Sequence, residues 1–175
     1  MEVNTLLWRN HFLAGFAAGI LVTGWAHGAP QLWLAGAVSG AAALVPDLDS
    51  PRSRLGKKVA PVSWTAGRLF GHRGVTHSLA GWAAAVFLFG LAVRQAAGRL
   101  PWHAPWTGWS FLVPLFATGY LSHILTDCLT IEGCPVLWPS SRRFRLPLMT
   151  TGSPLGETVA TLAGVGLILF LLAGR

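Results

Sequence analysis

The chain has 175 residues, a length typical of one domain, and its composition excludes the ordinary soluble classes. Hydrophobic residues make up 53% of it and charged residues only 11%, whereas a soluble domain carries about 25% charged residues. Nine Trp and nine Phe exclude a disordered chain, and two Cys make no disulfide framework. In so apolar a chain, a net charge of +7 favours a role in membrane topology over nucleic-acid binding. The composition therefore predicts a single membrane-embedded domain over residues 1–175.

Five apolar stretches are expected to cross the membrane, because a spanning helix needs roughly 20 mostly apolar residues. In chain order they are Phe12–Ala29, Gln31–Val45, Leu79–Val93, Trp109–Thr126 and Leu155–Ala173. The second and third stretches are short, so two short, tilted or re-entrant helices are an alternative there. The predicted fold is all-α, a polytopic membrane helical bundle of about five transmembrane helices.

The basic residues gather on one side of this arrangement, and cytoplasmic loops carry the excess of Lys and Arg in membrane proteins. Ten of the 13 basic residues lie in the N-terminal segment and in the loops after the second and fourth spans. They are Arg9, Arg52, Arg54, Lys57, Lys58, Arg68, Arg73, Arg142, Arg143 and Arg145. We therefore predict a bacterial-type inner (cytoplasmic) membrane protein with its N-terminus inside. A cleaved signal peptide is the alternative for the first 29 residues, although no A-x-A site follows them.

The predicted orientation places four short polar segments on the same, cytoplasmic face of the membrane. They are His11, Pro46–Asp49, Gly71–Ser78 and Ser122–Asp127. The orientation depends on Lys and Arg alone, so this gathering of histidines and carboxylates is an independent result. Ionisable groups near the bilayer are costly and tend to mark function. The sequence thus predicts a functional site at the cytoplasmic ends of the helices.

The residue types in these segments are those of a metal site. The predicted set is Asp47, Asp49, His72, His77, His123 and Asp127. His123 and Asp127 lie four residues apart and so share one face of a helix. Imidazole and carboxylate ligands together suit Zn²⁺, Mn²⁺ or Fe. His11 is either a further ligand or an ordinary interfacial histidine.

Two more charged residues and one helix start are candidates for the chemistry. Arg73 either binds a phosphate or carboxylate or serves only the membrane topology. Glu157 is a ligand, a general base or a partner of Arg73 or Arg143. The backbone N–H groups at the start of the third span, around Thr76–Ser78, are expected to favour an anion such as phosphate.

These motifs resemble those of the YdjM-type predicted membrane-bound metal-dependent hydrolases. The matching segments are Pro46–Asp49, Gly71–Ser78 and Gly119–Thr130, followed by Gly133 and Pro139. The family is distantly similar to zinc-dependent phospholipase C and its related single-strand nucleases, which place helical His-x-x-x-Asp pairs on clustered zinc. The resemblance implies ligands or near-ligands at His11, Asp47, Asp49, His72, His77, His123 and Asp127. Ser50 departs from the pattern, because the family often has His there.

We therefore predict an enzyme, a phospholipase-like hydrolase that cleaves a phosphoester of a lipid or lipid-linked substrate in the bilayer. Two or three divalent ions, with Zn²⁺ favoured over Mn²⁺ or Fe, would provide a metal-activated water. Asp49, Arg73 and Glu157 are the expected catalytic residues. A metal-dependent amidase, deacylase or peptidase is one alternative, disfavoured because H-E-x-x-H is absent from the sequence. A non-enzymatic metal-binding membrane protein is the other.

Overall fold

The computed structural model describes residues 8–24, 29–49, 74–97, 108–148 and 153–173. Five α-helices follow one another in these residues: α1 (Trp8–Thr23), α2 (Ala29–Ala42), α5 (Leu79–Ala97), α6 (Trp109–Cys128) and α7 (Pro154–Ala173). Two short 3₁₀ helices, η1 (Pro46–Asp49) and η2 (Val75–His77), come between α2 and α5. Within the described part of the chain, the β-structure is one isolated bridge between Cys134 and Phe144. The predicted all-α fold with five helices is confirmed.

The first two helices end earlier than predicted. α1 ends at Thr23 because Gly24 adopts a φ of 71°, a left-handed conformation that commonly closes a helix. α2 ends at Ala42, and the following backbone tightens into i→i+3 hydrogen bonds ahead of Pro46. Within the described residues, α1 covers 16 positions and α2 covers 14, fewer than the roughly 20 that cross a bilayer.

Three helices, α5, α6 and α7, are long and apolar enough to cross a membrane. Only 11% of the most apolar part of α5, and the same share of α7, is buried within the molecule. Large outward side chains on them, such as Phe87, Leu162 and Phe170, are 65–72% exposed. Apolar surface of this extent is compatible with lipid and not with water.

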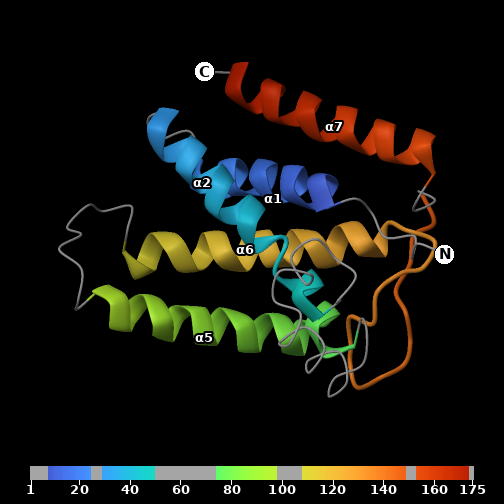
Figure 1. The fold of residues 1–175 in the computed structure, drawn as a ribbon, viewed down its shortest axis with the longest axis horizontal. Helices are drawn as coiled ribbons and strands as arrows, with labels where there is room; N and C mark the ends of the chain where they lie inside the picture. The colour runs from blue at the N-terminus through green and yellow to red at the C-terminus, as the bar shows by residue number, and fades with distance from the viewer. Residues whose placement is uncertain (1–7, 25–28, 50–73, 98–107, 149–152, 174–175) are drawn as a thin grey trace.

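Helix α6 is the centre of the bundle. It contacts α5 on one side and both α1 and α2 on the other, while α7 packs against α1 (Figure 1). Small residues allow very close approach, as is usual for helices packed in membranes. A Cβ atom at Gly119 of α6 would lie 2.0 Å from the backbone oxygen of Ser39 in α2. The backbones of α2 and α6 are therefore in direct contact at Gly119 and Ser39.

One end of the bundle collects the helix ends that carry the polar motifs. The starts of α1, α5 and α7 and the end of α6 all lie at the right of Figure 1. The two 3₁₀ helices contact each other, and η2 leads directly into α5. The gathering of the polar segments at one end, predicted from charge placement, is therefore present in the fold.

Candidate metal centre

Six of the seven predicted metal ligands are described and come together in the bundle. This His/Asp cluster consists of His11 from α1, Asp47 and Asp49 from η1, His77 from η2, and His123 and Asp127 from α6. Asp47 is partly exposed, and the other five are buried. The seventh predicted ligand, His72, and the predicted phosphate-binding Arg73 lie outside the described residues. Four segments that are distant in sequence thus supply one compact group of imidazoles and carboxylates.

The middle of the His/Asp cluster is a meeting point of two imidazole nitrogens and two carboxylate oxygens. The Nε2 atoms of His77 and His123 lie 3.2 Å apart. Oδ2 of Asp127 lies 3.6 Å from Nε2 of His77 and 3.7 Å from Nε2 of His123. Oδ1 of Asp47 lies 3.8 and 3.9 Å from the same two nitrogens.

These separations fit a shared cation. Ligand atoms about 2.0–2.2 Å from a tetrahedral zinc ion lie roughly 3.3–3.6 Å from one another. The observed separations of 3.2–3.9 Å bracket that range. They are also too long, at 3.6 Å and above, for N–H···O hydrogen bonds between the imidazoles and the carboxylates. Two groups of three ligand atoms could therefore hold a metal ion: those of His11, His123 and Asp127, and those of Asp47, His77 and His123.

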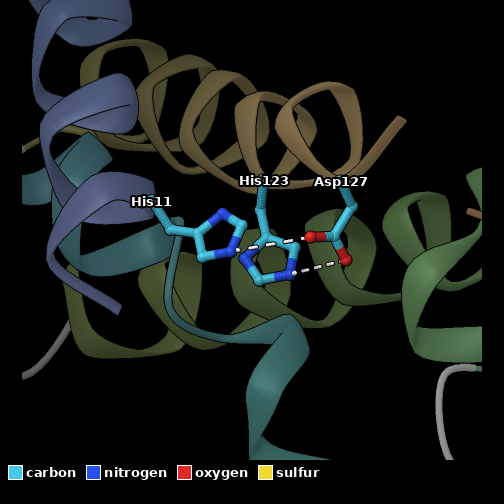
Figure 2. Close-up of side chains that lie close together, drawn as sticks. All are labelled: His11, His123 and Asp127. Atoms are coloured by element: carbon cyan, nitrogen blue, oxygen red, sulfur yellow. Dashed lines mark ion pairs between the residues drawn. The ribbon is translucent and has the colours of Figure 1, made fainter. Parts of the chain in front are cut away.

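His11 faces the other oxygen of the Asp127 carboxylate. Its Nε2 lies 3.6 Å from Oδ1 of Asp127, and its ring stacks on that of His123 with centroids 3.9 Å apart. Figure 2 shows Asp127 reaching back along α6 toward both rings. Asp127 thus directs one oxygen toward His11 and the other toward His77 and His123, which is the geometry of a carboxylate able to bridge two ions.

The hydrogen bonds of the histidines determine which ring nitrogen carries the proton. Nδ1 of His123 lies 2.7 Å from the carbonyl oxygen of Ala43, which can only accept, so Nδ1 donates. Nδ1 of His11 lies 2.9 Å from the Thr126 hydroxyl, which gives its own proton to a backbone carbonyl of α6. In the singly protonated ring, this leaves Nε2 unprotonated and facing Asp127, as a metal ligand requires.

His77 also has a hydrogen-bond partner at Nδ1, the Thr76 hydroxyl, which in turn bonds to the carboxylate of Asp49. The Thr76 hydroxyl donates to Oδ2 of Asp49 and accepts from Nδ1 of His77 at 3.0 Å. Oδ2 of Asp49 lies 3.7 Å from that Nδ1, on the side of the ring away from the other imidazoles. Among the described contacts, Asp49 therefore lies beside Nδ1 of His77, a position that suits the near-ligand role that the family resemblance allowed.

Glu157 is buried at the start of α7. It contacts Asn10, the residue that directly precedes His11 in α1. Asn10 donates to Oε2 of Glu157 at 2.6 Å and accepts from the Thr161 hydroxyl at 2.7 Å. Arg143, one predicted partner of Glu157, instead donates to the carbonyl oxygen of Glu132. That pairing was wrong because Arg143 is on the exposed loop after α6, while Glu157 faces α1.

Several backbone donors at the start of α5, where the anion site was predicted, bond within the chain. The backbone N–H groups of His77, Ser78 and Leu79 donate to the carbonyls of Gly74, Val75 and Val136. The Gly81 N–H donates to the Ser78 hydroxyl. The phosphate site at this helix start stays a prediction.

Sequence reasoning missed Thr126 as a partner of the metal site. Its signal was present, since a hydroxyl residue three positions after His123 lies on the same side of a helix. We expect Thr126→Val to lower zinc affinity about 10–100-fold, because the partners that orient a metal-bound His have effects of that size. Competition with a chelating dye in detergent measures it.

Thr158→Val is the matched control for this substitution. The Thr158 hydroxyl also bonds a carbonyl of its own helix, that of Pro154, but it lies on the exposed side of α7. It should leave zinc affinity unchanged. Equal affinity in the Thr126 and Thr158 variants would show that Thr126 does not orient His11.

Comparison with known proteins agrees with a membrane location. Relatives include the inner membrane protein YdjM of Escherichia coli (strain K12) and that of Shigella flexneri, each 43% identical over 106 residues. That alignment covers 61% of this chain and 50% of each relative, so the chain spans about half of their length. The uncharacterized protein YvsG of Bacillus subtilis (strain 168) is 29% identical over 174 residues, 95% of this chain and 97% of that protein.

No solved structure is significantly similar to the chain. The family model described as YdjM inner membrane protein matches residues 6–174. That match covers nearly all of the sequence, including every residue of the His/Asp cluster. The chain therefore belongs to the YdjM family of inner membrane proteins.

Proposed function

We propose that this membrane protein is a metal-dependent hydrolase that cleaves a phosphoester of a lipid or lipid-linked substrate. One observation carries the proposal, which is that three buried imidazoles turn their Nε2 atoms toward the carboxylate of Asp127. A divalent ion held there, zinc being favoured, would supply a Lewis acid and an activated water. Soluble enzymes with the same donor types use them for hydrolysis.

Each residue of the His/Asp cluster has a distinct part in this proposal. Asp47, His77 and His123 would hold one ion, and His11 with Asp127 would contribute to a second, next to the shared His123. Asp49 bonds to Thr76, which holds the His77 ring, and is proposed to take up a proton. Arg73 remains our proposed phosphate-binding residue, and His72 a proposed ligand.

The location of the His/Asp cluster favours a lipid over a soluble substrate. The cluster sits at the end of α6 and directly before α5, two helices able to cross a membrane. A lipid can bring its headgroup to such a site while its acyl chains stay in the bilayer. Glu157, one turn into α7, is at a similar depth and is proposed as a general base that Asn10 positions.

Metal analysis joined to an activity assay tests the proposal. Protein purified in detergent with zinc present should hold at least two equivalents, because five described ligands exceed the four of one tetrahedral ion. It should hydrolyse at least one member of a phospholipid panel, and a chelator should abolish that activity until zinc is returned. Bound zinc without turnover of any lipid would favour the non-enzymatic alternative, and less than one equivalent would exclude the metal site.

The proposed topology has five crossings with the N-terminus in the cytoplasm. The ten-to-three division of basic residues supports this orientation, and the antiparallel course of the helices in Figure 1 is compatible with it. Reporter fusions at the two ends should give opposite sides of the membrane, with the C-terminus outside. Fusions that report the same side would contradict five crossings, whichever side it is.

A further inference from the structure

A groove of about 800 Å³ runs along α5 and α6, outside the His/Asp cluster. Its lining follows one face of α5 at four-residue intervals and is completed by α6. The residues that matter here are Trp82, Val86, Gly90 and Arg94 from α5 and Trp109 and Val113 from α6. The interval of four places the α5 residues in a single row along the helix.

The groove is apolar along its length and charged at one end. Arg94 is the only charged residue in its lining, and no described carboxylate pairs with it. Arg94 lies in the last turn of α5, whereas His77 directly precedes the start of that helix. The charged end of the groove is therefore at the opposite end of α5 from the His/Asp cluster.

The size of the groove matches the tail of one lipid. From Trp82 to Arg94 the row covers roughly 18 Å at the rise of an α-helix. One leaflet contributes about 15 Å to the hydrocarbon core of a bilayer. At Gly90, which is buried, a Cβ atom would lie 3.1 Å from Nε1 of Trp109, so this glycine lets the indole of α6 pack close to α5.

We propose that this groove binds one anionic glycerophospholipid from the leaflet opposite the His/Asp cluster. The Arg94 guanidinium would donate to the lipid phosphate, a planar donor set that suits phosphate oxygens. One acyl chain would lie along the row from Gly90 to Trp82. An anionic headgroup is favoured because a zwitterionic one would bring an ammonium group next to Arg94 with no described carboxylate to balance it. This site is independent of the proposed hydrolase activity.

Native mass spectrometry of the detergent-purified protein, titrated with phosphatidylglycerol, tests the proposal. Wild-type protein should retain one phosphatidylglycerol in preference to phosphatidylcholine. Arg94→Gln should weaken that binding at least about fivefold, the effect of one basic residue on an anionic lipid. Arg94→Lys should keep most of it.

Ala83 and Ala84 offer a matched pair for the apolar part of the groove. Both are exposed on α5, but only Ala83 lines the groove. Ala83→Trp should abolish lipid retention, and Ala84→Trp should not change it. Unchanged retention in both Ala83→Trp and Arg94→Gln, or equal binding of phosphatidylcholine by the wild type, would overturn the proposal. Because Arg94 is exposed, its variants test the proposal even if Ala83→Trp fails to fold.

Discussion

Replacing Asp127 by Asn is expected to remove bound metal and to abolish hydrolysis. The Asp127 carboxylate faces Nε2 of His11 with one oxygen and those of His77 and His123 with the other. An amide removes the charge and replaces one oxygen by an N–H donor that cannot bind a cation. We expect metal affinity to fall by more than about 100-fold. Loss of a residue that only orients a metal ligand lowers affinity by up to about 100-fold, and Asp127 is proposed to bind the metal directly. Metal content by mass spectrometry and lipid turnover measure the two effects.

His123→Ala should have the same consequences, and the double variant should be little worse than either single one. Residues that serve one unit fail together, so their effects are strongly non-additive. Glu132→Gln is a suitable control, since it removes a carboxylate just beyond α6 and outside the His/Asp cluster. An Asp127→Asn protein with full metal content and full activity would defeat the assignment of the site. Membrane insertion should be unaffected, because an amide is no costlier in a helix end than a carboxylate.

Gly119→Ala is expected to destabilise the protein and loosen the metal site at the same time. The added methyl group would lie 2.0 Å from the backbone oxygen of Ser39, and backbone cannot rotate away as a side chain can. Overpacking of this kind typically costs about 1–3 kcal/mol. Separating α2 from α6 also lengthens the bond between His123, one turn beyond Gly119, and the carbonyl of Ala43. The melting temperature in detergent and the metal content of the purified protein should both fall.

Gly166→Ala is the control for that experiment. Gly166 is also within a helix long and apolar enough to cross a membrane, α7, but a Cβ atom there would meet nothing within 4 Å. Its melting temperature should be unchanged or slightly raised, because Ala favours a helix more than Gly does. If both glycine variants behave alike, the close contact of α2 and α6 does not support the site.

Local properties of the sequence predicted much of this molecule. Apolar stretches long enough to span a bilayer predicted five helices, and all five are present. The four-residue spacing of His123 and Asp127 predicted a shared helix face, and their side chains lie 3.7 Å apart. The predicted orientation brought His11 and His77 to the same end because consecutive spans alternate in direction. Hydropathy, helical period and charge placement are properties of short segments, so the sequence alone determined them.

Only the tertiary structure decided which atoms face one another within the His/Asp cluster. The partners that assign the proton to Nδ1 of His11 and His123 are Thr126 and the carbonyl of Ala43, 115 and 80 residues away. Asn10 and Glu157, 147 residues apart, are likewise joined by packing. The backbone N–H of Leu79, the first residue of α5, donates to the carbonyl of Val136, a residue of the loop after α6. A hydrogen bond is made or lost when the distance between its atoms changes by a few tenths of an ångström. Distances between helices become that precise only when the helices are closely packed.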